Sequence, residues 1–151
     1  MEKSRAELAG RPLAVVRSIR VQGYDVDFAG IVSNIVYIRW LEDLRVQMLD
    51  TYLPLQTLLA DGLAPVLART EIDYRRPIRL FDEVEGRMWL TEAASPRWTL
   101  AAELYANGKR AAQARQTGVF VYTATLRPAP LPARLQTLWA ASQPADQPPT
   151  P

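Results

Sequence analysis

The sequence predicts an α+β domain in which one apolar helix packs against an antiparallel sheet. Two observations support this prediction. A helical pattern of apolar residues follows residue 33, and four segments of alternating apolar and polar residues come after it, mostly joined by short turns. With 151 residues, 48% of them hydrophobic, the chain suits one domain with a substantial core. We expect a flexible N-terminus over residues 1–12, one domain over residues 13–141 and a disordered proline-rich tail over residues 142–151.

The first two predicted elements are a strand within residues 13–24 and a helix that begins at Ser33 or Asn34. The second half of the strand segment alternates apolar with polar side chains, as a half-buried strand does. Ser33 and Asn34 both suit the N-cap position, and the apolar turns that follow predict that this end of the helix is buried. Apolar residues at helical spacing form one face of the helix, namely Tyr37, Leu41, Leu44 and Met48.

Four further strands are predicted over residues 63–76, 83–93, 98–106 and 109–124, followed by a short helix over residues 131–141. The dipeptide Asn107-Gly108 predicts a two-residue hairpin turn, because both residues tolerate positive φ. In the strand predicted over residues 63–76, strict alternation places every second side chain on a common face. These residues are Val66, Ala68, Thr70, Ile72 and Tyr74. A five-stranded sheet leaves open edges, so we expect at least a dimer that pairs through the sheet.

Histidine and cysteine are both absent from the sequence. Their absence excludes Ser-His-Asp triads, thiolate nucleophiles and metal sites built from these residues. General acid or base chemistry near pH 7 must then use Asp, Glu, Tyr, Lys or bound water. The net charge of +2, with scattered arginines, argues against nucleic-acid binding. The lack of cysteine, of a signal peptide and of a long apolar run fits a cytoplasmic protein without a membrane span.

The turn between the first strand and the helix carries two carboxylates, Asp25 and Asp27, together with Gly30. A helix N-terminus offers unpaired backbone N–H groups and the positive end of the helix dipole, equivalent to about half a unit charge. Such groups can hold an electron-rich oxygen while a carboxylate acts on the adjacent carbon. A core helix preceded by an acidic turn has the same pattern, so spacing alone leaves both interpretations open. We interpret Asp25 as a structural turn residue.

Two segments carry a family resemblance. The first reads YDVDFAGIV over residues 24–32, and the second, weaker one reads IDYRRP over residues 72–77 and is followed by Asp82. After the first segment the helix carries further matching residues, namely Asn34, Tyr37, Trp40, Leu41 and Glu42. Together these residues resemble the hotdog-fold acyl-CoA thioesterases, specifically the group of 4-hydroxybenzoyl-CoA thioesterase and the YbgC-type enzymes. The resemblance covers residues 15–125.

The resemblance implies a long central helix wrapped by an antiparallel sheet, and dimers, often tetramers, with active sites at the dimer interface. It implies thioester hydrolysis without a metal or any cofactor other than the coenzyme A of the substrate. Asp27 corresponds to the catalytic carboxylate, and the backbone N–H of Asn34 to the group that polarises the thioester carbonyl. The asparagine at position 34 is a departure, because many relatives have a tyrosine or a histidine at this position. Gly30 lets the loop backbone approach the ligand.

The resemblance further implies a set of substrate-binding residues: Ile31, Val32, Ser33, Tyr37, Arg75 and Arg76. The two arginines could meet coenzyme A phosphates or lie at a solvated strand end. Tyr37 could equally belong to the core. An ionised aspartate can attack the thioester carbonyl directly or deprotonate a water molecule, and both mechanisms remain open for Asp27.

The leading interpretation is hydrolysis of an acyl-CoA or acyl-carrier-protein thioester. A non-catalytic hotdog module that binds acyl-CoA is the alternative. A hotdog dehydratase or hydratase ranks lower, because such enzymes usually need histidine. The chemical identity of the acyl group is left open by the sequence.

Overall fold

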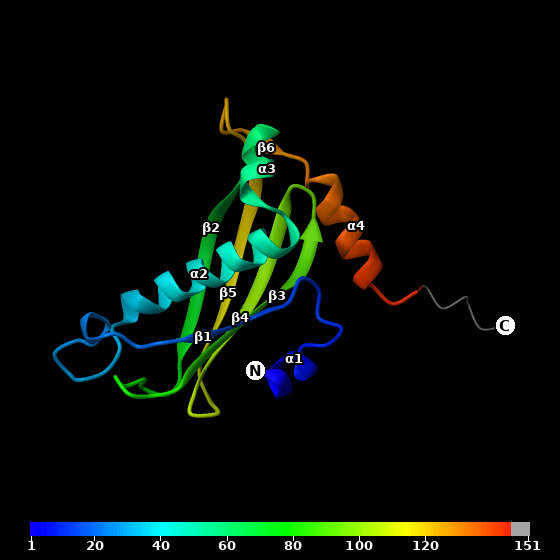
Figure 1. Ribbon diagram of the computed structural model, residues 1–151. Helices are drawn as coiled ribbons and strands as arrows, with labels where there is room; N and C mark the ends of the chain where they lie inside the picture. Colours follow the sequence, from blue (N-terminus) through cyan, green and yellow to red (C-terminus); the bar gives the residue numbers. More distant parts are fainter. Residues whose placement is uncertain (146–151) are drawn as a thin grey trace.

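A computed structural model describes residues 1–145 and confirms the predicted α+β fold. Six strands form one antiparallel sheet in the order β1–β3–β4–β5–β2, with β6 paired to β5. Helix α2 lies along one face of this sheet (Figure 1). The elements in chain order are α1 (Glu2–Glu7), β1 (Val15–Ile19), the 3₁₀ helix η1 (Gly23–Asp25), α2 (Asn34–Tyr52), α3 (Leu55–Ala60), β2 (Leu63–Tyr74), β3 (Val84–Ala94), β4 (Arg97–Ala106), β5 (Lys109–Tyr122), β6 (Pro128–Ala129) and α4 (Ala133–Ser142).

The sheet contains six strands rather than the predicted five. The additional strand, β6, is two residues long and pairs with Phe120 and Val121 of β5. It lies in a proline-rich stretch that has no alternating pattern, so periodicity could not predict it. The predicted first strand is also shorter than expected, because β1 ends at Ile19 and η1 follows before α2.

A β-bulge in β2 changes which of its side chains face the helix. The pairing of β2 with β5 shifts between Leu67 and Arg69, so Ala68 is an additional residue on β2. Leu67 and Ile72 consequently both pack against the core, whereas Val66 and Ala68 are exposed. The predicted common face was therefore wrong for Val66 and Ala68, because strict alternation assumes a strand without a bulge.

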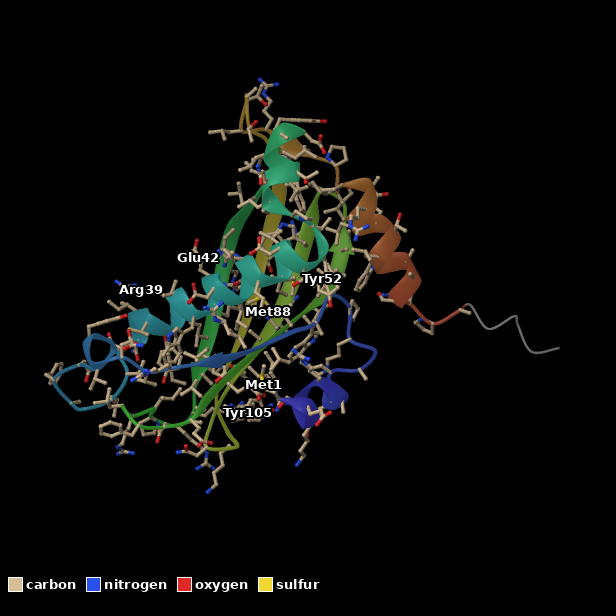
Figure 2. The ribbon with its side chains drawn as sticks, viewed as in Figure 1. Met1, Arg39, Glu42, Tyr52, Met88 and Tyr105 are labelled. Atoms are coloured by element: carbon tan, nitrogen blue, oxygen red, sulfur yellow. The ribbon has the colours of Figure 1, made fainter. Side chains whose placement is uncertain are left out.

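The core lies between α2 and the face of the sheet that α2 covers. Leu41 and Leu44 of α2 and Met88 of β3 are 0% exposed. Burying a leucine side chain completely contributes about 1.5–3 kcal/mol, so this contact is a main source of stability. Arg39 and Glu42 are exposed on the outer side of the helix, whereas Met88 lies beneath it (Figure 2).

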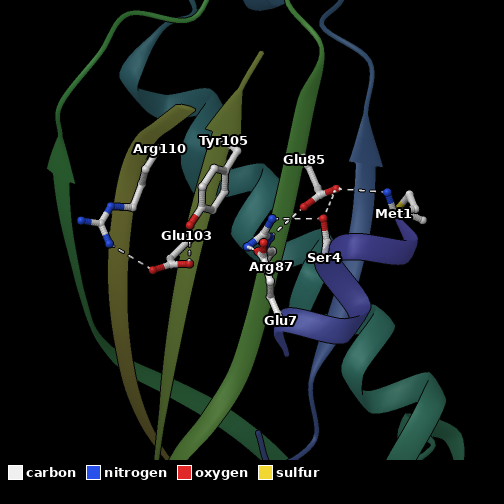
Figure 3. A network of polar contacts seen from close by, with 8 residues as sticks. All are labelled: Met1, Ser4, Glu7, Glu85, Arg87, Glu103, Tyr105 and Arg110. Carbon is white, nitrogen blue, oxygen red and sulfur yellow. Dashed lines mark hydrogen bonds and ion pairs between the residues drawn. The ribbon is translucent and has the colours of Figure 1, made fainter. Parts of the chain in front are cut away.

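Helix α1 binds the opposite face of the sheet through a polar network (Figure 3). Glu85 and Arg87 alternate with the fully buried residues of β3, so their side chains point away from α2. The Ser4 hydroxyl donates to Glu85 at 2.9 Å, and Arg87 donates to Glu85 at 2.7 Å and to Glu7 at 2.8 Å. Residues 1–12, expected to be flexible, thus include a helix that is bonded to the sheet.

Helix α4 closes one end of the core. Arg134 Nε donates to the backbone carbonyl of Tyr52 at 2.7 Å, which joins α4 to the end of α2. The helix extends to Ser142, the first residue of the predicted disordered tail. The end of that tail, residues 146–151, lies outside the described residues. Throughout the described part of the chain, the helices lack the combination of length and apolarity that crossing a bilayer requires.

Gly118 of β5 provides the space that the indole ring of Trp98 occupies. A Cβ atom at position 118 would overlap with the Trp98 ring and with the backbone oxygen of Val66. We therefore expect Gly118→Ala to lower the free energy of unfolding by about 1–3 kcal/mol through overpacking. Gly23→Ala is the matched control, since a Cβ there meets nothing within 4 Å. Urea unfolding measures both variants, and equal midpoints would contradict this packing.

Candidate active site

The loop between η1 and α2 is closed by its own backbone. Val26 and Val32 form an antiparallel bridge, and the Asp27 N–H donates to the carbonyl of Ile31 at 2.9 Å. The Gly30 N–H donates to the Asp27 carbonyl at 3.0 Å, and Gly30 has a φ of +75°, a conformation that favours glycine. Gly30 therefore closes the turn that carries Asp27.

The two carboxylates of this turn have different surroundings. Asp25 is 5% exposed, its Oδ2 accepts from the Gln22 N–H at 2.8 Å, and its backbone carbonyl accepts from the Ser33 N–H at 2.9 Å. Asp27 is partly exposed, and its Oδ1 accepts from the Ala29 N–H at 2.8 Å. Its Oδ2 accepts no hydrogen bond from the described residues and is available to a ligand. In the described part of the chain, no cluster of three or more carboxylates is placed to hold a metal ion.

The first backbone N–H groups of α2 lack protein acceptors. Ser33, one of the two residues predicted for the N-cap position, is the N-cap residue, but its side chain makes no capping bond. The Val36 N–H donates to the Ser33 carbonyl at 2.9 Å, whereas the N–H groups of Asn34 and Ile35 donate to no acceptor among residues 1–145. Two such groups at the positive end of a helix dipole can hold an oxyanion.

The loop and the helix start are attached to the segment that follows β2. The Val32 N–H donates to the carbonyl of Ile78 at 2.8 Å, and the Tyr74 hydroxyl donates to the carbonyl of Asn34 at 3.3 Å. Ile78 is 0% exposed. Tyr74 belongs to the resembling segment of residues 72–77 but was not predicted as a site residue, and Ile78, which follows that segment, was not predicted either. Both bonds hold the helix start beside residues 75–79.

Three exposed arginines lie on this segment: Arg75, Arg76 and Arg79. The backbone N–H groups of Arg75 and Arg76 donate to the carbonyl of Ala111 at 2.8 and 3.0 Å, which fixes the backbone here. The three guanidinium groups make no ion pair with the described residues. Because Ile78 of the same segment bonds to the loop, the backbone that carries these three arginines lies next to the candidate site.

Tyr37 lies in the core beneath the helix start. It is 3% exposed, and its ring packs edge-on against Tyr74, with 4.9 Å between the ring centroids. The ring of Trp40 packs against it at a tilt, with 5.5 Å between the centroids. Burial, together with the nearby Tyr74, raises the pKa of Tyr37 to about 12, so the phenol is neutral at pH 7. Val32 is also buried, at 2% exposure. The predicted substrate-binding residues that reach the surface are Ile31, Ser33, Arg75 and Arg76.

An apolar cavity lies farther along α2, between this helix, the sheet and α4. Its volume is about 70 Å³, and Leu53 and Leu135 are among the residues that line it. The one charged lining residue is Arg45. The sequence analysis missed Arg45, although its position, four residues after Leu41 and three before Met48, is within the apolar stripe of the helix. A charge inside such a stripe was the signal that could have identified it.

Asp25 and Asp27 should differ in how much each side chain contributes to the free energy of unfolding. Asp25→Ala should lower the free energy of unfolding by about 1–2 kcal/mol. The reason is that the partly buried Gln22 N–H would lose the carboxylate oxygen that accepts its hydrogen bond. Asp27→Ala should change it by no more than about 0.5 kcal/mol, because its one hydrogen bond is exposed. Urea midpoints measure both values, and a larger loss for Asp27→Ala would contradict the assigned roles.

The fold has counterparts among solved structures. A thioesterase from Thermus thermophilus, complexed with coenzyme A and zinc, is 28% identical, with a TM-score of 0.74 over 89% of this chain and 98% of that chain. A 1,4-dihydroxy-2-naphthoyl-CoA thioesterase from Synechocystis is 23% identical, with a TM-score of 0.76 over 84% and 96%. A thioesterase superfamily protein from Jannaschia is 22% identical, with a TM-score of 0.79 over 89% and 97%. Comparison with curated proteins gives no match.

A family model identifies the sequence independently of the fold. The model of the thioesterase-like superfamily matches residues 21–138, a range that contains Asp27, the start of α2 and the segment of residues 75–79. The predicted resemblance to hotdog thioesterases is thereby confirmed. On this evidence the protein belongs to the thioesterase-like superfamily.

Proposed function

We propose that this protein hydrolyses an acyl thioester of coenzyme A or of acyl carrier protein to the free acid and the thiol. Asp27 is the reacting carboxylate, and the backbone N–H groups of Asn34 and Ile35 form the oxyanion site. One observation carries this proposal: the loop before α2 presents a carboxylate oxygen, and the first turn of α2 presents two N–H groups, that all lack partners among the described residues. Membership in the thioesterase-like superfamily supports thioester hydrolysis in general.

The reaction proceeds in this account by addition to the thioester carbonyl. Its oxygen gains negative charge as the tetrahedral intermediate forms, and one donor of the oxyanion type typically lowers the barrier by about 3 kcal/mol. In one route Asp27 attacks the carbonyl carbon, the C–S bond breaks to release the thiolate and form a mixed anhydride, and water then cleaves the anhydride to the free acid and regenerates Asp27. In the other route Asp27 takes the proton from an attacking water molecule, and the tetrahedral intermediate collapses with breakage of the C–S bond to give the free acid and the thiolate. In both routes the thiolate is protonated after it leaves. A thiolate is a good leaving group, so the reaction proceeds without histidine.

The arginines beside the site suit the phosphates of coenzyme A. Arg75, Arg76 and Arg79 are exposed on the segment that bonds to the active-site loop, and guanidinium groups bind phosphate oxygens in a bidentate manner. One structural relative was solved with coenzyme A bound, which supports a coenzyme A-containing substrate. The same arginines could also contact the phosphopantetheine group of a carrier protein.

A homodimer formed through β2 is part of the proposal. Strand β2 is 12 residues long and lies at the edge of the sheet, where its unpaired backbone groups can bond to a second copy. Helix α2 also exposes apolar side chains, with Ile35 at 65%, Ile38 at 42% and Val46 at 42%. Pairing two copies of β2 about a two-fold axis would satisfy the open edge.

Asp27→Asn should lower kcat/KM for acyl-CoA hydrolysis by about a hundredfold or more, because an amide is a poor nucleophile and a poor base. Release of free thiol from short, long and aromatic acyl-CoA esters measures the rate. Asp43→Asn is the control, since Asp43 is an exposed carboxylate of α2 outside the loop. Equal rates in wild type and Asp27→Asn would remove Asp27 from the mechanism. Binding of acyl-CoA without turnover would favour a non-catalytic module.

The double substitution Arg75→Ala with Arg76→Ala should raise KM for acyl-CoA several-fold and leave kcat within about twofold, because the phosphates lie far from the reacting carbon. The same acyl group on N-acetylcysteamine, which has no phosphate, should show no change in KM. Steady-state kinetics at low and high salt measures the effect, which should shrink as salt screens the charges. An equal rise in KM for both substrates would contradict phosphate binding.

Sedimentation velocity should find a dimer at micromolar concentration. Val66→Lys should weaken it, because Val66 is 41% exposed on β2 and a lysine there opposes edge pairing. Leu126→Lys is the control, since Leu126 is 74% exposed in the turn between β5 and β6. A monomeric wild type, or equal weakening by both substitutions, would contradict pairing through β2.

A further inference from the structure

The cavity beneath the second half of α2 combines apolar walls with one cation. Its volume of about 70 Å³ exceeds the space that a single water molecule needs, so it can accept a short chain of atoms. The side chains that line it, apart from Arg45, are hydrophobic and include Met48, Leu67, Trp98 and Phe120. Among them Trp98 carries one polar group, an indole N–H that is buried and makes no hydrogen bond with the described residues. A charged group is an exception in such a setting and needs a physical reason.

A buried hydrogen-bond network holds Arg45 in place. One terminal guanidinium nitrogen of Arg45 donates to Gln116 Oε1 at 2.9 Å. Gln116 is 1% exposed, and its Nε2 donates to Thr70 Oγ1 at 3.1 Å. Because a guanidinium has only donors, the amide oxygen of Gln116 must face Arg45, and its amide nitrogen is then left to donate to Thr70. The network therefore fixes the position of the cation at the cavity wall.

The charge of Arg45 has no counter-ion in the described part of the chain. No carboxylate among residues 1–145 makes an ion pair with it. Burial lowers the pKa of Arg45, and Glu42 partly offsets this through its charge without contacting the guanidinium. Of the five N–H donors of the guanidinium, the described hydrogen bonds use one. A partly buried cation with free donors is stabilised by a ligand that brings an anionic acceptor.

The proposed dimer places this cavity near a reaction site. In one chain, the Tyr74 end of β2 contacts the start of α2, while Pro65 and Leu67, in the half of β2 nearer Leu63, line the cavity. Arg45 is about 16 Å along the helix from Asn34, at 1.5 Å per residue. Antiparallel pairing of two β2 strands puts the Tyr74 end of one strand opposite the Leu63 end of the other. In such a dimer, the helix start of the partner subunit would approach the edge of the cavity.

We propose that the cavity receives the far end of the acyl group and that Arg45 selects acyl groups ending in a carboxylate. The substrate class is then the coenzyme A thioesters of dicarboxylic acids. Arg45 donates hydrogen bonds to the distal carboxylate, and the apolar walls contact the methylene groups between it and the thioester. This inference rests on the proposed function and on the proposed dimer, and it deepens both by naming the substrate class.

The test compares matched substrates that differ only at the distal end. The glutaryl, adipoyl and suberoyl thioesters of coenzyme A are paired with the pentanoyl, hexanoyl and octanoyl thioesters. The wild type should prefer the dicarboxylic member at the chain length that reaches Arg45. Arg45→Met should lower the ratio of the two kcat/KM values by about tenfold to a hundredfold, the range for a hydrogen bond to a charged group. Arg45→Lys should restore part of the ratio.

Arg39→Met is the matched control, because Arg39 is an exposed arginine of the same helix that does not line the cavity. For Arg39→Met, the ratio of kcat/KM for the dicarboxylic thioester to kcat/KM for its monocarboxylic partner should equal that of the wild type. If wild type and Arg45→Met hydrolyse both members of each pair with the same ratio, thioester hydrolysis stands and the role of Arg45 is overturned. Loss of the dimer in Arg45→Met, seen by sedimentation, would assign Arg45 to the subunit interface and also overturn the proposal.

A binding measurement separates this proposal from the proposed function. Calorimetry with free adipate and free hexanoate needs no hydrolysis, so it gives a result even if no thioester is turned over. Tighter binding of adipate that is lost in Arg45→Met supports the inference in either case. Absence of any thioester turnover would instead count against the proposed function alone. Equal affinity of wild type for the two acids would overturn the role of Arg45.

Discussion

Helix α2 buries one face against the sheet, and this contact determines where both ends of the helix lie. Leu41 and Leu44 have no exposed surface, so the helix cannot shift without opening the core. The loop before α2 is bonded to Ile78 through Val32, and that bond places the first N–H groups of the helix beside the segment after β2. The unpaired groups at the helix start are held at the surface by a rigid core rather than by the loop alone.

The two ends of α2 then carry different chemistry. At its start, Asp27 and the N–H groups of Asn34 and Ile35 provide a carboxylate and donors for an oxyanion. In its second half, Arg45 provides a fixed cation in an apolar cavity. In one chain these features are separated by three turns of helix. In the proposed dimer, a two-fold axis through β2 would bring the start of one helix toward the cavity of the other, and so would bring reaction and selection together.

Local signals predicted much of the fold and pointed to the loop that carries the candidate site. Strand alternation and the apolar stripe predicted the strands and the start of α2, and Asn107 and Gly108 have the positive φ values of +50° and +76° that their turn requires. The bulge in β2 was not predictable from alternation, because it is defined by the register of β2 against β5. The bond of Gln116 to Arg45 joins residues 71 positions apart, and such contacts leave no periodic signal in one sequence.

The most direct test of the account is a crystal structure of Asp27→Asn with an intact acyl-CoA thioester bound. We predict that the thioester oxygen lies about 3 Å from the N–H of Asn34 or Ile35, with the side chain at position 27 next to the carbonyl carbon. A thioester bound away from the start of α2, with both N–H groups still unoccupied, would contradict the assignment of the site.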